Sequence, residues 1–179
     1  MGIRTNYEKW YEGDAYYWGL EPGDFLDELI ELCPPSTDKR VLDIGCGEGK
    51  DAVYMAQKGY DVTAFDLTEN GIRKTVALAN KRNTNINAYV DDINTFSTDE
   101  QFDIIYSTGT VQYLFEENKK VSLKSLIRSQ RGTELFISMY LLRNHSWNYL
   151  RIGIWKRRCG SQASSSPILL TGRSNALMK

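Results

Sequence analysis

The chain has 179 residues, of which 41% are hydrophobic, 25% charged and 12% aromatic, a composition typical of one globular domain. The mean hydropathy is −0.45, and no apolar run approaches the roughly 18 residues that a membrane-spanning helix needs, so the sequence excludes an integral membrane protein. The formal net charge of −1 conceals an imbalance, because residues 1–118 hold 10 Lys and Arg against 22 Asp and Glu, whereas residues 119–179 hold 12 against one.

Residues 1–22 contain a dense group of aromatic side chains. Six of the aromatic residues of the chain lie within twelve positions: Tyr7, Trp10, Tyr11, Tyr16, Tyr17 and Trp18. Aromatic faces attract cations and exclude water, so we expect this segment to form a lid over a binding site. The alternative is that these side chains only pack over the edge of a sheet.

Residues 23–144 alternate between helical and extended patterns. Strands that alternate with helices at this spacing predict a mainly parallel sheet with helices on both faces, and the fold class is therefore α/β, doubly wound. The C-terminal strands are expected to be incomplete, because nothing after Asn144 has the pattern of a paired hairpin. The expected elements are a helix over 25–33, a strand over 40–44, a helix over 52–59, a strand over 60–65, a helix that Thr68 caps and that runs to 82, strands over 86–90 and 102–106, a helix over 121–129 and a strand over 131–140.

The turn between the first strand and its helix carries the main functional signal. From Val41 to Gly49 it reads V-L-D-I-G-C-G-E-G. Lys50 stands where a dinucleotide fingerprint needs its third glycine, and Asp51 stands where a P-loop needs Ser or Thr. An acid at position 43 repels a pyrophosphate but can hold an ammonium group, while the amides of the turn can meet an anion. The pattern thus predicts a ligand that carries both charges.

This turn resembles the first motif of class I S-adenosylmethionine-dependent methyltransferases, whose ligand ends in a methionine ammonium and carboxylate. The resemblance implies that S-adenosylmethionine is the cofactor and that Asp43, Gly45, Cys46 and Gly47 surround its amino-acid end. It also implies a packing role for the Cys46 thiol rather than a nucleophilic one.

Three later segments fit the same resemblance. Asp66, at the end of the second strand, implies hydrogen bonds to the ribose hydroxyls, and Leu67 implies a contact with the adenine face. Asp92 and the backbone of Ile93, after the third strand, imply contacts with the adenine amino group and its surroundings. The residues from Ser107 to Gly109, at the end of the fourth strand, are implied to line the floor beside the methionine portion.

The N-terminal pattern W-Y-x5-Y-W-G-x2-P is similar to that of the small methyltransferases related to tellurite-resistance and thiopurine methyltransferases, in which this segment borders the active site. Residues 107–113 replace the [DN]-P-P-[YF] pattern of nucleic-acid amino methyltransferases, so the expected acceptor is a small molecule. No residue is assigned a catalytic role, because positioning can supply most of the acceleration of an in-line methyl transfer. The expected pocket residues are Trp10, Tyr16, Tyr17, Gln112 and Tyr113.

Residues 145–179 form a basic, serine-rich tail without a sustained period. Two interpretations stay open for the sequence from about residue 119 onward: a functional basic extension that attracts RNA, or a segment outside the native reading frame. The alternatives to a small-molecule methyltransferase are accordingly an RNA methyltransferase and a non-catalytic module that binds S-adenosylmethionine or nucleic acid.

The three cysteines, at positions 33, 46 and 159, are an odd number and lack metal-ligand spacing. The first six residues lack the apolar stretch of a secretory signal. These features favour a cytoplasmic protein without a metal site or a membrane association. Its expected partner is the small-molecule acceptor rather than nucleic acid, and the sequence indicates no particular oligomeric state.

Overall fold

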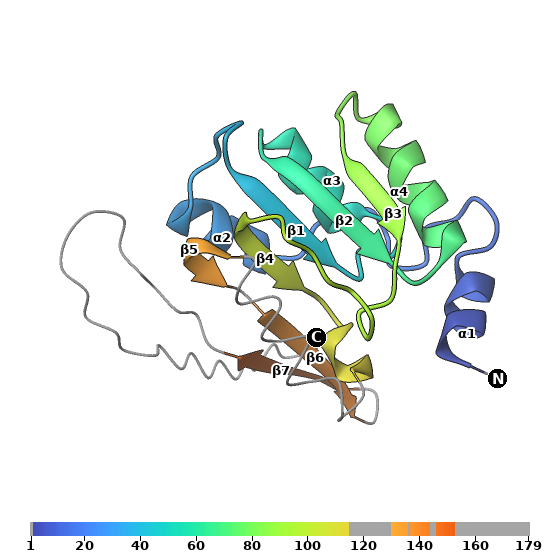
Figure 1. The fold of residues 1–179 in the computed structure, drawn as a ribbon. Helices are drawn as coiled ribbons and strands as arrows, with labels where there is room; N and C mark the ends of the chain where they lie inside the picture. Colours follow the sequence, from blue (N-terminus) through green and yellow to red (C-terminus); the bar gives the residue numbers. More distant parts are fainter. Residues whose placement is uncertain (1, 115–129, 136, 144–145, 153–179) are drawn as a thin grey trace, which may run out of the picture.

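The computed structural model describes residues 2–114, 130–135, 137–143 and 146–152, and it shows an α/β fold built on one parallel sheet (Figure 1). Every neighbouring pair of strands in this sheet is parallel. The predicted fold class is therefore confirmed. Within the described residues the sheet has the strand order β3-β2-β1-β4-β5, formed by β1 (Arg40–Ile44), β2 (Asp61–Asp66), β3 (Asn87–Val90), β4 (Phe102–Ser107) and β5 (Gln130–Leu135).

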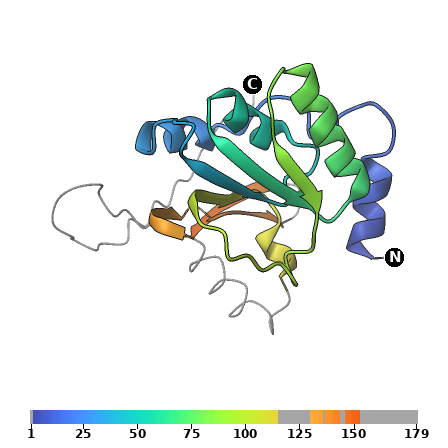
Figure 2. The same ribbon diagram turned by 45° about the horizontal axis from the view of Figure 1, so that its top comes forward.

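The helices place most of their described apolar side chains on one face of this sheet. Val41 of β1 lies in a buried cluster with side chains of α2 and α3, whereas Leu42 and Ile44 lie in a second cluster on the opposite face, together with Phe96 and η1. Figure 2 shows α3 and α4 above the sheet and η1 below it. No helix in the described residues is both long enough and apolar enough to cross a bilayer. The helices are α1 (Ile3–Trp10), α2 (Phe25–Leu32), α3 (Lys50–Gln57), α4 (Glu69–Lys81) and the 3-10 helix η1 (Val111–Tyr113).

The C-terminal strands differ from the prediction. β6 (Ile137–Arg143) and β7 (Ser146–Ile152) form a separate antiparallel pair. The predicted single strand over 131–140 is therefore wrong, and so is the expectation that no hairpin follows residue 144. The run from 135 to 142 contains no glycine or proline, so the sequence offers no signal for the break between β5 and β6. The predicted helix over 121–129 and residues 153–179 of the tail lie outside the described residues.

α4 begins where the sequence predicts and lies close to the turn after β1. The Thr68 hydroxyl accepts a hydrogen bond from the Gly71 amide at 3.2 Å, which satisfies an amide of the first turn. A Cβ atom at Gly71 would lie 2.6 Å from the carbonyl oxygen of Gly47. Glycine at position 71 therefore allows the helix to approach the turn.

α1 was not predicted, and it is held by the N-terminus of α4. The carboxylate of Glu8 accepts hydrogen bonds from the amides of Glu69 at 2.6 Å and Asn70 at 3.1 Å. A carboxylate is stabilising at this position, because the first amides of a helix have no partner within the helix and the helix dipole favours negative charge there. α1 is thereby fixed beside the carboxyl edge of the sheet (Figure 1).

Candidate functional site

A cavity of about 660 Å³ opens at the carboxyl edge of the sheet, where β1 lies between β2 and β4. Parallel sheets bind ligands at this kind of edge, at the point where the strand order reverses. Its walls come from the turn after β1, from the segments after β2, β3 and β4, and from the N-terminal segment. The residues predicted from the sequence that line it are Asp43, Gly45, Cys46, Gly47, Asp66, Leu67, Asp92, Ile93, Gln112 and Tyr113.

The glycines of the turn are required by its close packing. Gly45 has a φ of +74°, and a Cβ atom there would lie 1.9 Å from the Thr110 hydroxyl oxygen. Gly49 has a φ of +87°, and a Cβ atom there would lie 2.5 Å from the Thr75 hydroxyl oxygen. Other residues pay a steric penalty at such φ values, so these positions need glycine for both conformation and space.

Most amides of this turn donate within the protein. The turn is buried, and buried amides need partners. The expectation that the amides of the turn meet an anionic ligand group is therefore wrong for four of them. The amides of Gly45 and Cys46 donate to the Phe65 carbonyl at 2.8 and 2.9 Å, that of Gly47 to Asp66 Oδ2 at 2.9 Å, and that of Gly49 to the Cys46 carbonyl at 2.9 Å.

Asp43 places a buried carboxylate against the cavity. The residue is 2% exposed, and its Oδ2 atom has no hydrogen bond of ordinary geometry among the described residues. Burial, and next the Asp51 carboxylate, raise the pKa of Asp43 well above its ordinary value, while the neighbouring Tyr106 hydroxyl opposes the shift. A buried carboxylate that lacks a partner is costly, and a cationic ligand group would supply one.

Asp66 holds the turn and the start of α4 together. Its Oδ2 accepts from the Gly47 amide, and its Oδ1 accepts from the Thr68 amide at 2.9 Å and the Thr68 hydroxyl at 2.6 Å. Burial raises the pKa of Asp66, and these hydrogen bonds oppose the shift. A carboxylate has about four acceptor positions, so Asp66 retains capacity for a ligand hydroxyl.

The segment after β3 is tied to the segment after β4. Asp92 Oδ1 accepts from the amide of Asn94 at 2.9 Å and from its side-chain nitrogen at 3.0 Å. The same nitrogen lies 3.2 Å from the Tyr113 carbonyl oxygen, to which it also donates. Ile93 is buried, and Leu67 is half-buried on the neighbouring wall. These contacts fix the distance between Asp92 and η1.

Ser107 lies behind the cavity rather than on its floor. It is fully buried, and its hydroxyl donates to the Ile44 carbonyl at 2.9 Å. The next residues, from Thr108 to Thr110, line the cavity instead. The Thr108 hydroxyl oxygen and the Gln112 side-chain oxygen are buried there without a hydrogen-bond partner among the described residues. The predicted range from Ser107 to Gly109 is therefore wrong for Ser107, whereas Thr108 and Gly109 do line the cavity.

The aromatic segment divides into two groups. Tyr7, Tyr11 and Trp18 line the cavity, whereas Trp10, Tyr16 and Tyr17 do not, which corrects the pocket predicted from the sequence. Tyr7 and Tyr11 lie one helical turn apart, and the Trp10 ring packs edge-on against Tyr7, with the ring centres 4.9 Å apart, but stays exposed. The rings of Trp10 and Tyr17 stack on each other 5.3 Å apart, with 44% and 52% of each residue exposed. The Tyr16 ring lies against the Lys74 ammonium, 5.4 Å away.

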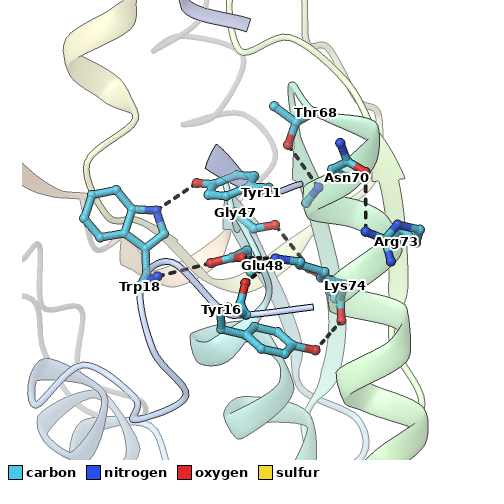
Figure 3. A network of polar contacts seen from close by, with 12 residues as sticks. Tyr11, Tyr16, Trp18, Gly47, Glu48, Thr68, Asn70, Arg73 and Lys74 are labelled. Carbon is cyan, nitrogen blue, oxygen red and sulfur yellow. Dashed lines mark hydrogen bonds and ion pairs between the residues drawn. The ribbon is translucent and has the colours of Figure 1, made fainter. Parts of the chain in front are cut away.

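A buried ion pair ties the N-terminal segment to both α4 and the turn (Figure 3). Lys74 Nζ and Glu48 Oε1 are 2.7 Å apart, and their side chains are 3% and 2% exposed. The other Glu48 oxygen accepts from the Trp18 amide at 3.1 Å, and Lys74 Nζ also donates to the Ala15 carbonyl. Sequence patterns missed this cluster, because its members lie far apart in the chain and a single lysine on a helix gives no signal.

Cys46 shows the contacts of a packing residue. Its sulfur lies 3.8 Å from the Thr75 hydroxyl oxygen, and burial raises the pKa of the thiol well above its ordinary value. The thiolate needed by a nucleophile is therefore disfavoured. Among the described residues no group of His, Cys, Asp and Glu is arranged to hold a metal ion.

Comparison with known proteins gives a consistent result. Residues 22–136 match the model of a family described as tellurite resistance protein TehB. This match runs past residue 119, which argues against a break in the reading frame at that point. The chain is 35% identical, over 106 residues, to a probable S-adenosyl-L-methionine-dependent methyltransferase TehB of Haemophilus influenzae; the alignment covers 58% of this chain and 35% of that protein.

Two solved structures are similar to the fold. The crystal structure of TehB from Haemophilus influenzae matches with a TM-score of 0.62 and 27% identity, over 77% of this chain and 46% of that chain. A coclaurine N-methyltransferase bound to N-methylheliamine and S-adenosylhomocysteine matches with a TM-score of 0.55 and 26% identity, over 64% of this chain and 35% of that chain. The chain thus spans less than half the length of these proteins.

Proposed function

This chain belongs to the TehB family, and on that premise we propose that it is an S-adenosylmethionine-dependent methyltransferase that acts on a small-molecule acceptor. The observation that carries the proposal is the buried Asp43 carboxylate, which faces the cavity at the carboxyl end of β1 and whose Oδ2 atom has no hydrogen bond of ordinary geometry among the described residues. An amino-acid ammonium would satisfy it. Membership of the family and the similar proteins support the same activity.

The lining of the cavity fits each part of this cofactor. In the proposal Asp43 holds the ammonium, Asp66 accepts from a ribose hydroxyl with its remaining lone pair, and Leu67 contacts the adenine face. Asp92 accepts from the adenine amino group, and the Ile93 backbone lies beside it. Gly45, Cys46 and Gly47 form the wall beside the amino-acid end.

The chemistry of the proposed reaction asks little of the protein beyond positioning. The bound cofactor supplies a methyl group on a sulfonium, and the protein aligns the acceptor for an in-line displacement. Tyr7, Tyr113 and Trp18 exclude water and offer aromatic faces that stabilise positive charge. Thr108 and Gln112 supply unpaired oxygens that can orient the acceptor. No residue is assigned as a general base.

A small-molecule acceptor is proposed because aromatic side chains of the N-terminal segment line the cavity. The coclaurine N-methyltransferase, one of the similar structures, holds a small molecule beside S-adenosylhomocysteine. We further propose a cytoplasmic protein, because its three cysteines are an odd number and lack metal-ligand spacing, with no role for nucleic acid in the reaction. RNA that binds in a salt-dependent manner and accepts a methyl group would contradict this part of the proposal.

Calorimetric titration of the full chain with S-adenosylhomocysteine, the demethylated product, tests the proposal without knowledge of the acceptor. Micromolar binding is the expected result. Asp43→Asn should weaken it by about tenfold or more, because the variant keeps the shape of the side chain but loses the charge that pairs with the ammonium. Asp38→Asn, at an exposed position outside the cavity, is the matched control. A folded wild-type chain that binds neither S-adenosylhomocysteine nor S-adenosylmethionine would refute the proposed function.

A further inference from the structure

The Tyr11 hydroxyl accepts a hydrogen bond, and no acceptor for its own hydrogen is seen among the described residues. Tyr11 is 3% exposed and lines the cavity. Its oxygen accepts a hydrogen bond from the indole nitrogen of Trp18 at 2.8 Å, so its own O–H is free to donate in another direction. Burial, and next the nearby Asp66 carboxylate, raise the pKa of Tyr11, so the phenol stays protonated at neutral pH.

This hydroxyl lies directly over the glycine turn. A Cβ atom at Gly47 would be 3.1 Å from the Tyr11 oxygen and 3.8 Å from the Trp18 ring. Figure 3 shows Tyr11 and Trp18 together, with Gly47 behind them. Trp18 is in turn fixed through its amide to Glu48, whose other oxygen pairs with Lys74. The direction of the Tyr11 hydroxyl is therefore set by a chain of contacts that ends at the buried Glu48–Lys74 pair.

The amino-acid end of the proposed cofactor needs hydrogen-bond donors, and most amides of the turn do not provide them. A carboxylate accepts several hydrogen bonds, but four amides of the turn already donate to acceptors within the protein. Of the two cationic side chains among the described lining residues, Lys50 pairs with Asp51 at 3.0 Å, and Arg4 pairs with Glu69 at 3.5 Å near the surface. The other charged side chains of the lining are all acidic, and they repel a carboxylate: Asp43, Glu48, Asp51, Asp66, Asp91 and Asp92.

We propose that the Tyr11 hydroxyl donates a hydrogen bond to the carboxylate of the amino-acid end of S-adenosylmethionine, and that Trp18 orients this hydroxyl. The assignment rests on the proposed function. It makes Tyr11 a cofactor-binding residue and Trp18 a positioning residue. In this arrangement Asp43 takes the ammonium and Tyr11 takes the carboxylate, so each charge of the amino-acid end has a partner from a different segment of the chain.

Binding of two ligands to Tyr11→Phe tests the assignment. S-adenosylmethionine and decarboxylated S-adenosylmethionine differ only in the carboxylate, and calorimetry on the full chain gives both affinities. We expect Tyr11→Phe to weaken S-adenosylmethionine by about tenfold and to leave the decarboxylated ligand within about twofold of wild type. Trp18→Phe, which removes the indole donor and keeps an aromatic ring, should show the same selectivity with a smaller loss. Tyr54→Phe, which removes an exposed hydroxyl that donates to Asp27, is the control and should change neither affinity.

The outcomes separate this assignment from the proposed function. If wild type binds S-adenosylmethionine and Tyr11→Phe binds both ligands as well as wild type, the assignment is overturned and the proposed function stands. An equal loss for the two ligands also overturns it, because the hydroxyl would then act through the fold or the ribose. A wild-type chain that binds neither ligand overturns the proposed function and this assignment together. Thermal unfolding of each variant shows whether a loss reflects a less stable chain.

Discussion

The two walls of the cavity are built in different ways. The turn after β1 is a local structure, fixed by left-handed glycines and by amides that donate to neighbouring backbone and to Asp66. The N-terminal segment 3–18 is fixed by contacts with residues far along the chain, made by the side chains of Glu8 and Tyr16 and by the amide of Trp18. The first wall is a rigid product of backbone conformation, and the second depends on a few buried polar contacts. Substitutions that change the backbone conformation should therefore disrupt the first wall, and substitutions that remove one polar partner should disrupt the second.

The largest effect is expected on the second wall, from Lys74→Met. This variant leaves the Glu48 carboxylate buried without its partner, which should lower the free energy of unfolding by about 3 to 5 kcal/mol. Urea denaturation measures it. The double variant Lys74→Met with Glu48→Gln removes both charges and should recover a large part of the loss. Equal losses for the single and double variants would mean that the ion pair is not the source of the effect.

The first wall is tested by two glycines with the same backbone conformation and different surroundings. Gly45 and Gly109 both have a φ of +74°, but a Cβ atom at Gly45 would overlap Thr110, whereas one at Gly109 has nothing within 4 Å. Gly109→Ala should cost about 1 to 2 kcal/mol for conformation alone. Gly45→Ala should cost about 3 kcal/mol or more, because the overlap is added to it. Similar losses in urea denaturation would show that the turn relaxes easily.

A substitution of Asp43, at the base of the turn, should raise the free energy of unfolding, whereas the substitutions above lower it. Folding raises its pKa above the ordinary value of 3.8, so the native chain binds more protons than the unfolded chain above that pH. The free-energy cost of burying the Asp43 carboxyl is absent below pH 3.8. It grows as the pH rises, until Asp43 ionises in the native state. Asp43→Asn should therefore flatten the fall of stability with pH and be more stable than wild type at neutral pH in the absence of ligand. Parallel pH profiles of unfolding would contradict this.

The smallest effect is expected at the contact between α1 and α4. Glu8→Ala removes the carboxylate that caps the first amides of α4 and should lower the free energy of unfolding by about 1 kcal/mol. Glu12→Ala removes a nearby exposed carboxylate and is the matched control. Added salt should reduce the difference between the two variants, because part of it is electrostatic. Equal stability of the two variants would show that Glu8 does not stabilise the N-terminus of α4.

The same comparison explains what the sequence could predict. The turn, the cap at Thr68 and the strand ends that carry Asp66 and Asp92 are encoded within a few residues, so local patterns locate them. The aromatic segment was recognised by its density, but which of its side chains line the cavity depends on the packing of α1, which the sequence did not indicate, and on the contacts that Trp18 makes with Tyr11 and Glu48. The Glu48–Lys74 pair depends on tertiary packing alone, which no local pattern records.

The closeness of Gly71 to the Gly47 carbonyl has a consequence for evolution in this family. Any side chain at position 71 would displace α4 from the turn, since a Cβ atom there would lie 2.6 Å from the Gly47 oxygen and 2.5 Å from the Thr68 hydroxyl oxygen. Substitutions at position 71 should therefore appear in homologues only together with changes at 47 or 68. Such covariation would mark the chains in which the ribose end of the site has been remodelled.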